Sequence, residues 1–152
     1  MADYGKARLA VSSTAFDSNE VIPVQYTCDG SNINPSLQIH DIPEQAQSLV
    51  LVVDDPDAPM GTWDHWLVWN IEPTSEIKEN STPGIEGINS FEQHQYGGPC
   101  PPSGTHRYFF KVYALDQMIK LKADSRKHEL LVAIDNHIIA YGELIGKYAR
   151  IH

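Results

Sequence analysis

The sequence alternates between short runs of apolar, β-branched and aromatic residues and short clusters of turn-forming residues. The clearest runs are residues 48–54, 65–71 and 106–115, the last of which reads HRYFFKVYAL. Runs of this length, bounded by Gly, Pro, Asn and Asp, are typical of strands in antiparallel sheets. Further strands are predicted at residues 8–15, 21–27, 36–40 and 138–147. The pattern therefore predicts a mainly β, largely antiparallel protein.

One α-helix is predicted near the C-terminal end of the chain. Residues 126–135 are good helix formers, and Leu130, Leu131 and Ile134 fall on one face by helical spacing. Asp124 or Ser125 can cap its N-terminus. This helix interrupts the strands and precedes the last of them.

Two other segments are predicted to be irregular. Residues 43–47 are expected to form one short helical turn, and residues 73–105 contain no long apolar run. A loop as long as the second often carries function when it belongs to a compact domain. At 152 residues, the chain is expected to form a single domain spanning residues 1–152.

The overall charge and the cysteine count narrow the classes of partner and location. The net charge of -9 argues against binding to nucleic acid or to an anionic lipid surface. A small anionic ligand is compatible with it, because local donors can outweigh a diffuse field. No apolar run has the length of a signal peptide or a membrane span, so a cytoplasmic location is predicted. Two cysteines, Cys28 and Cys100, are too few for a disulfide-rich secreted scaffold and are predicted to be reduced thiols.

The first of two loaded segments, meaning segments rich in side chains that could bind a ligand, is DDPDAPMGTWDHW, at residues 54–66. It lies between two predicted strands. Asp55 and Asp57 are two residues apart, so in an extended backbone they share a face. His65 begins the next strand and is expected to return to the same end of the sheet. A carboxylate beside an imidazole fixes its orientation, so Asp55 is predicted to orient His65. The alternative, left open for Asp57, is that these carboxylates only accept hydrogen bonds from turn amides.

Two tryptophans follow this histidine in the predicted strand 65–71. Because side chains alternate along a strand, Trp69 is expected on the same face as His65 and Trp66 on the opposite face. Trp69 is therefore the tryptophan expected on the same side of the sheet as His65, although deeper in the sheet.

The second loaded segment is YGGPCPPSGTHRY, at residues 96–108. Its glycines allow exposed amides, and its prolines stiffen the loop. In the strand that follows, His106 and Tyr108 share one face and Arg107 points to the other. The two donors beside a loop of free amides could bind an oxyanion. Arg107 is predicted to be a structural ion-pair partner of an aspartate in the first segment.

Four stretches together resemble the phosphatidylethanolamine-binding protein family, in particular its short bacterial and archaeal branch. They are YTCDGSNINPSL from Tyr26, DDPDAP from Asp54, WDHWLVWNI from Trp63 and GGPCPPSGTHRYFFKVYALD from Gly97. The resemblance implies a mainly β fold with a large central antiparallel sheet packed on a smaller sheet, and a few short helices. It also implies a cis peptide bond between Ala58 and Pro59, an X-Pro bond for which the cis form is accessible.

The resemblance further implies an anion pocket at one end of the large sheet, with a set of ligand-binding residues. They are Asp55, His65, the backbone of Gly98, His106 and Tyr108, with Pro59 and Trp63 as apolar walls. The short branch implies a homodimer, and a pocket that is either more open than in longer relatives or closed by a partner subunit. No cofactor and no metal are expected.

The predicted function is a non-enzymatic protein that binds an anionic or phosphate-bearing ligand, such as a phospholipid headgroup or a phosphorylated side chain. The resemblance extends this to an inhibitor-like regulator of a kinase or a protease. One alternative is a hydrolase that uses the two histidines, Asp55 and a serine such as Ser103. The other is a metal-dependent enzyme that uses Asp55, Asp57, His65 and His106. A separate hypothesis is that, if their loops meet, oxidation of Cys28 and Cys100 closes or distorts the pocket.

Overall fold

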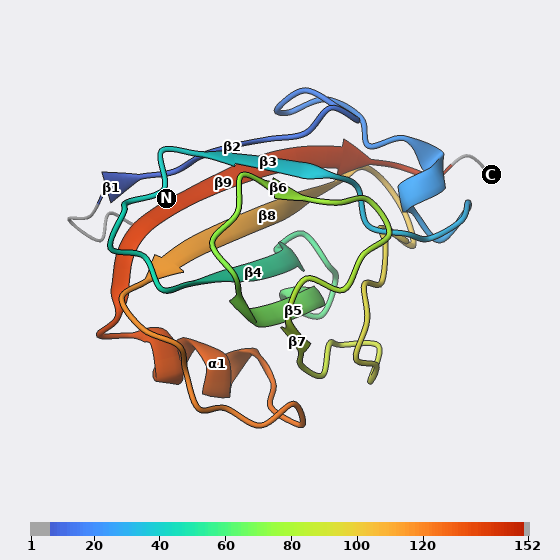
Figure 1. Ribbon diagram of the computed structural model, residues 1–152. Coiled ribbons are helices and arrows are strands. Elements are labelled where there is room, and N and C mark those ends of the chain that lie inside the picture. Colours follow the sequence, from blue (N-terminus) through green and yellow to red (C-terminus); the bar gives the residue numbers. More distant parts are fainter. Residues whose placement is uncertain (1–6, 151–152) are drawn as a thin grey trace.

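The computed structural model describes residues 7–150, which form two β-sheets, one α-helix and one short 3-10 helix (Figure 1). The strands are β1 Ala7–Arg8, β2 Ala10–Ser12, β3 Leu37–His40, β4 Ser48–Asp55, β5 Trp63–Ile71, β6 Glu76–Ile77, β7 Ile85–Glu86, β8 His106–Leu115 and β9 Ile138–Tyr148. The larger sheet has the order β1-β9-β8-β4-β5-β7, and the smaller has the order β2-β3-β6. A mainly β fold with a large and a small sheet is thus confirmed. The large sheet is mixed, because β1 pairs with β9 in parallel while its other pairs are antiparallel.

The four longest strands and the α-helix form where the sequence predicts them. β4, β5, β8 and β9 differ from the predicted ranges by at most two residues at an end. Helix α1, Lys127–Ile134, lies inside the predicted range 126–135. Its N-cap is Arg126 rather than Asp124 or Ser125, and the Arg126 N–H donates to Glu129 Oε1 at 2.8 Å. The side chain of Glu129, in the first turn, therefore accepts the backbone N–H of the N-cap residue, as in a capping box.

The predicted strand at residues 21–27 is wrong. Its third residue, Pro23, has no N–H to give to a strand ladder. The Pro23 carbonyl instead accepts the N–H of Tyr26 at 3.1 Å, which closes the 3-10 helix η1, Val24–Tyr26. This places the buried Tyr26 ring in the core and carries the chain on towards Cys28.

Three weaker predictions also need correction. The range 8–15 is divided between β1 and β2, and the range 73–105 contains the two-residue strands β6 and β7. Strands of two residues are too short to show an alternating pattern. Residues 43–47 form a turn closed by the Ala46 N–H and the Pro43 carbonyl at 3.0 Å, without a helix.

Both faces of the large sheet are covered, which explains why β4 is buried along its whole length. On one face, Leu49, Leu51 and Val53 pack with residues of β3 and β6. On the other face, Val50 and Val52 pack with residues of α1. A strand buried on both faces loses its apolar and polar alternation. The last two residues of β4, Asp54 and Asp55, are therefore buried carboxylates pointing to opposite faces.

An irregularity in β5 moves His65 to the face of the small sheet. Val53 is opposite Trp66, but Asp54 is opposite Asp64, so β5 has one residue more than β4 between these pairs. That residue is His65, and such a bulge places two successive side chains on one face. His65 and Trp66 therefore share a face, and Trp69 packs on the opposite side with α1. The prediction from simple alternation was wrong for both tryptophans.

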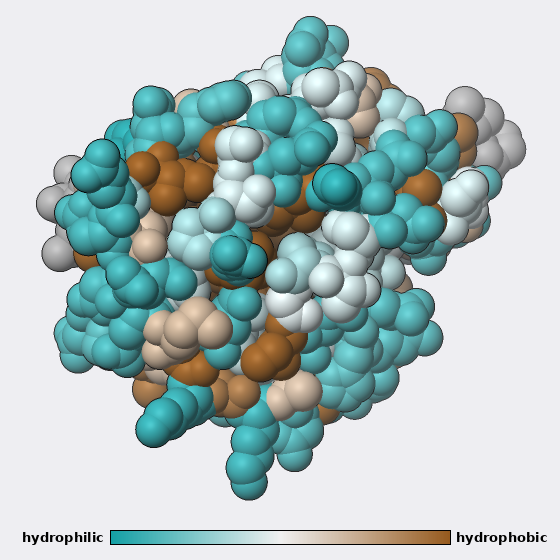
Figure 2. All heavy atoms as spheres, viewed as in Figure 1, coloured by the Kyte–Doolittle hydropathy of each residue, from teal (hydrophilic) through white to brown (hydrophobic). Residues whose placement is uncertain are grey.

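The face of the molecule seen in Figure 2 is mostly polar. Figure 2 shows hydrophilic side chains over most of one face, with apolar atoms in small separate areas. In the described part of the chain, no helix is long and apolar enough to cross a membrane.

Candidate functional site

A cavity of about 280 Å³ lies where the ends of β4, β5 and β8 meet the loops that follow residues 55 and 90. It is lined by Asp55, Ala58, Pro59, Trp63, His65, Phe91, Cys100, Pro101, Pro102, His106 and Tyr108. Six of the seven predicted ligand-binding residues are in this lining, and Gly98 is not. A volume near the lower end of small-molecule sites suits a compact ligand.

Asp55 at the end of β4 binds His106 at the start of β8. Its Oδ2 lies 2.6 Å from His106 Nδ1, and both side chains are almost fully buried. Its Oδ1 accepts the backbone N–H of Asp57 at 2.8 Å, so Asp55 also closes the turn. The predicted contact of Asp55 with His65 is wrong. The pairing of neighbouring strands β4 and β8 brings His106, and not His65, next to this carboxylate.

His65 has a neutral partner instead. Its Nδ1 lies 2.7 Å from the carbonyl oxygen of Gly97, and the Gly97 N–H donates to the His65 carbonyl at 3.0 Å. Since a carbonyl only accepts, Nδ1 carries the proton, and Nε2 is the atom left for a ligand. Burial lowers the pKa of His65, and the Gly97 carbonyl and nearby carboxylates, chiefly Asp55, offset this only in part. The ring is therefore neutral at pH 7, with a lone pair on Nε2.

Tyr108 lies between the two histidine rings. Its ring meets His65 edge-on at 5.2 Å between centroids and stacks on His106 at 6.5 Å. Its hydroxyl is buried, and no described residue accepts its proton, although the Cys100 backbone N–H lies close enough to its oxygen to lower the Tyr108 pKa. Burial, together with the charges of Asp55 and Asp57, raises the Tyr108 pKa. The hydroxyl therefore keeps its proton and is a donor without an acceptor, a feature that needs an explanation in a folded protein.

Asp57 and Arg107 form the predicted ion pair. The Arg107 backbone N–H and Nε both donate to Asp57 Oδ2 at 2.9 Å, and Nη2 donates to Oδ1 at 2.9 Å. These hydrogen bonds lower the Asp57 pKa to about 2. Asp57 thus holds the loop after β4 against β8, which answers the question left open for it in favour of a structural role.

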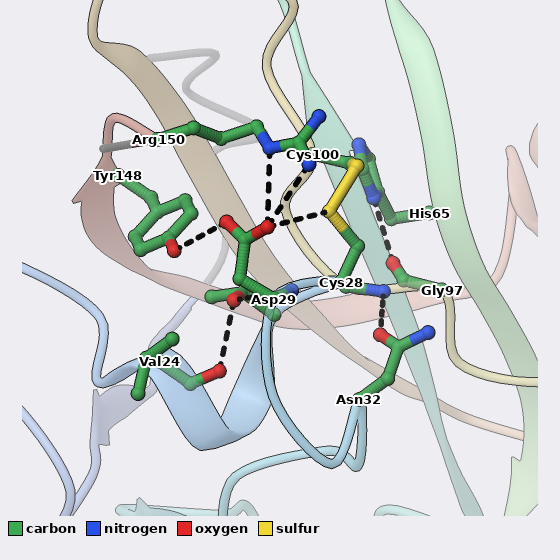
Figure 3. The surroundings of a disulfide bond; sticks show 11 residues. Val24, Cys28, Asp29, Asn32, His65, Gly97, Cys100, Tyr148 and Arg150 are labelled. Carbon is green, nitrogen blue, oxygen red and sulfur yellow. Dashed lines mark hydrogen bonds and ion pairs between the residues drawn. A yellow bond between two sulfur atoms is a disulfide. The ribbon is translucent and has the colours of Figure 1, made fainter. Parts of the chain in front are cut away.

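Cys28 and Cys100 form a disulfide, so the prediction of two reduced thiols was wrong (Figure 3). Their Cα atoms are 5.4 Å apart, although 72 residues separate them in the sequence. The two loops meet through backbone contacts, including the Cys28 N–H to the Pro99 carbonyl at 3.1 Å. Because Cys100 lines the cavity, the disulfide forms part of the cavity wall.

Two backbone predictions for the pocket are also corrected. The Gly98 N–H, expected to face a ligand, donates to Asn32 Oδ1 at 2.7 Å. The peptide bond between Ala58 and Pro59 is trans. The Gly61 N–H donates to the Ala58 carbonyl at 3.2 Å, which puts Pro59 at the second position of a turn. Trans proline suits this position, whereas cis proline belongs one residue later in a turn.

Neither of the two alternative constellations is assembled. Ser103 is exposed and does not line the cavity, and none of the described residues that line it is Ser, Thr or Lys. The four residues of the candidate metal site are divided between separate partners. Within residues 7–150, no group of three or more His, Cys, Asp or Glu side chains is placed to hold a metal ion.

Sequence reasoning missed Phe91 and the pair Pro101 and Pro102 as apolar walls. The Phe91 ring meets Trp63 edge-on at 5.6 Å and His65 at 5.3 Å. Phe91 lies in the long loop, where no periodic pattern marks a buried face. The two prolines belong to the second loaded segment, so their position beside His106 was the available signal.

The chain is similar to a family and to solved structures over almost its whole length. The phosphatidylethanolamine-binding protein family profile matches residues 12–149. A UPF0098 protein of Archaeoglobus fulgidus is 46% identical over 152 residues, which cover 95% of this chain and 52% of that protein. The chain thus spans about half the length of that relative.

Two crystal structures share the fold. One is a phosphatidylethanolamine-binding protein homolog of Chlamydia trachomatis, with 39% identity and a TM-score of 0.92 over 96% of this chain and 100% of that one. The other is YbcL of E. coli, with 29% identity and a TM-score of 0.87 over 95% of this chain and 100% of that one. With the family match and the fold in agreement, this chain belongs to the phosphatidylethanolamine-binding protein family.

Proposed function

We propose that this chain is a non-enzymatic binding protein that takes a phosphate-bearing ligand in the cavity beside His65 and His106. The observation that carries the proposal is the state of the two rings. Each has its Nδ1 engaged by a protein acceptor, while within the described residues Nε2 makes no hydrogen bond. The two ring nitrogens thus offer polar groups to one compact ligand, and Tyr108 lines the same cavity.

The lining supports binding rather than covalent chemistry. A hydrolase of the serine or cysteine type needs a hydroxyl or thiol beside a base, but none of the described lining residues is Ser or Thr, and the sulfur of Cys100 belongs to the disulfide. Trp63, Phe91 and the prolines provide apolar walls that exclude water from the polar floor. Hydrogen bonds to a charged ligand are stronger in such surroundings than in water.

Calorimetric titration with inorganic phosphate and with O-phosphoethanolamine tests the proposal. We expect saturable binding to the native chain and a loss of at least about tenfold in affinity in His65→Ala and in His106→Ala, since each removes a polar contact to a charged group. His137→Ala is the matched control, because His137 is also paired with an aspartate, at 3.0 Å from Asp116, but does not line the cavity. Absence of binding to the native chain, or equal loss in the control, would contradict the proposal.

Three further properties are part of the same proposal; the first two rest on the family, and the third rests on the lack of a long apolar run in the sequence. They are regulation of a kinase or protease, assembly into a homodimer, and a cytoplasmic location. Sedimentation of the native chain tests the dimer. The disulfide bears on the location, since such bonds persist mainly in oxidising compartments. In a reducing cytoplasm, the bond between Cys28 and Cys100 would be open to reduction.

A further inference from the structure

The two histidines of the cavity differ in what their Nδ1 atoms contact. His106 faces the carboxylate of Asp55 at 2.6 Å, and His65 faces the carbonyl of Gly97 at 2.7 Å. The carboxylate of Asp55 gives the His106 ring a charged partner. The partner of His65 is a neutral carbonyl, so the ring of His65 presents a lone pair at Nε2. The two rings of the cavity therefore differ in the charge of the group that contacts Nδ1.

The tautomer of His65 is held by its surroundings. Gly97 is bonded to both the ring and the backbone of His65, and a Cβ atom at Gly97 would meet the Phe91 ring at 2.5 Å. The Gly97 carbonyl is thus closely confined where it accepts the Nδ1 proton. Rotating the ring to offer Nδ1–H to a ligand would break this bond inside a buried site, where an unpaired carbonyl is costly.

Charged groups around His65 do not provide it with a dedicated counter-ion. On its own face, the titratable neighbours are Asp55, His106 and Tyr108, and Asp55 is already bonded to His106. Behind the sheet, Asp54 and Asp64 are bonded to lysines. Lys127 Nζ lies 2.6 Å from Asp64 Oδ1 and 3.3 Å from Asp54 Oδ2, and Lys111 Nζ lies 3.0 Å from Asp54 Oδ2. These two carboxylates and two ammonium groups balance each other in net charge.

We infer that the cavity selects a phosphate monoester in its singly protonated form, whose P–O–H group donates to the lone pair of His65 Nε2. This rests on the proposed function and narrows it to one ligand class. A phosphate monoester has a second pKa of about 6, so a protonated fraction persists at neutral pH. A sulfate ester or a phosphodiester is fully ionised and brings no proton. Its oxygen would face the His65 lone pair, so two acceptors would oppose each other.

Matched esters test this selection. We would titrate the native chain at pH 7.0 with O-phosphoethanolamine, with its sulfate analogue 2-aminoethyl hydrogen sulfate, and with the diester glycerophosphoethanolamine. We expect the monoester to bind at least about tenfold more tightly than the other two, because one hydrogen bond is replaced by a repulsion in a buried site. The diester arm separates a lipid headgroup from a terminal phosphate, which share the same ethanolamine.

NMR of the complex with the native chain shows which partner carries the proton. The ³¹P chemical shift of the bound monoester should be that of the monoanion above pH 7, where the free ester is a dianion. The ¹⁵N shifts of His65 in the complex should show a neutral ring protonated at Nδ1. In His65→Gln, an amide that can donate replaces Nε2, and the preference for the monoester over the sulfate ester should fall towards one.

The outcomes distinguish this inference from the proposed function. Equal binding of all three esters, or a protonated His65 ring beside a bound dianion, overturns the inference and leaves the phosphate-binding function standing. No binding of any ester overturns both. Tight binding of the monoester alone, with a monoanion ³¹P shift, supports both.

Discussion

At the scale of the residue, Asp55 and Asp57 show how two carboxylates separated by one proline differ in role. Asp55 is buried against His106, and Asp57 is half-exposed against Arg107. The sequence predicted the ion pair of Arg107, because strand alternation alone separates it from His106 and Tyr108. It did not predict the partner of Asp55, since the choice between two histidines depends on strand pairing. Sequence and family resemblance therefore predicted six of the residues that line the cavity, but not which histidine contacts Asp55.

The Asp57 ion pair predicts a pH-dependent loss of stability. The pKa of Asp57 is about 2 in the folded chain, below the ordinary value of 3.8. The stability that the ion pair contributes is therefore present above pH 4 and is lost as the pH falls towards 2. After allowance for solvent screening, Asp57→Asn should lower the free energy of unfolding by about 1 kcal/mol at pH 7. Urea denaturation should show this gap narrowing between pH 4 and pH 2.5. The exposed Asp124→Asn is the control, and a gap that stays constant with pH would refute the assignment.

At the scale of the element, the bulge in β5 decides which side chains enter the cavity. Hydrophobic runs located β4, β5, β8 and β9, because each is apolar enough to stand out from its flanks. A single extra residue leaves that pattern unchanged while turning His65 to the other face. The position of such a bulge comes from pairing between strands and the packing behind them, which no local window of sequence contains.

The packing behind the bulge predicts a role for the first residue of α1. Lys127 bridges Asp54 and Asp64, two carboxylates directly opposite each other on β4 and β5. Lys127→Met should lower the free energy of unfolding by about 2 kcal/mol, because the two like charges then share only Lys111. Denaturant unfolding measures this loss, and the exposed Lys122→Met should change little. Adding Asp64→Asn to Lys127→Met should restore part of the lost stability. If the losses of the two single variants simply add in the double variant, Lys127 does not bridge the carboxylates.

At the scale of the whole molecule, the disulfide joins two loops that also meet without it. Besides the backbone bond of Cys28, the Tyr96 hydroxyl donates to the Tyr26 carbonyl at 2.7 Å. The sequence could not reveal this pairing, because it depends on how two segments 72 residues apart settle on the same end of the sheet. The family resemblance covered both segments, but it implied nothing about their oxidation state.

Removing the disulfide should therefore affect stability more than binding. Cys28→Ser with Cys100→Ser should lower the free energy of unfolding by about 2–4 kcal/mol, since the unfolded chain regains the freedom of a long loop. Affinity for O-phosphoethanolamine should stay within about threefold, because the remaining hydrogen bonds keep the loops together. Thermal unfolding and calorimetry measure the two effects. A loss of binding larger than tenfold in a folded variant would show instead that oxidation controls the cavity.

The disulfide also makes the length of the stretched chain depend on the oxidation state of the two cysteines. If the two ends of a single molecule are pulled apart, the segment between Cys28 and Cys100 cannot lengthen while the sulfur atoms are joined. Each extended residue adds roughly 3.5 Å of contour, so reduction would release about 250 Å of hidden length across the 72-residue separation. In an optical trap, oxidised and reduced molecules would thus reach clearly different extensions once their sheets have come apart.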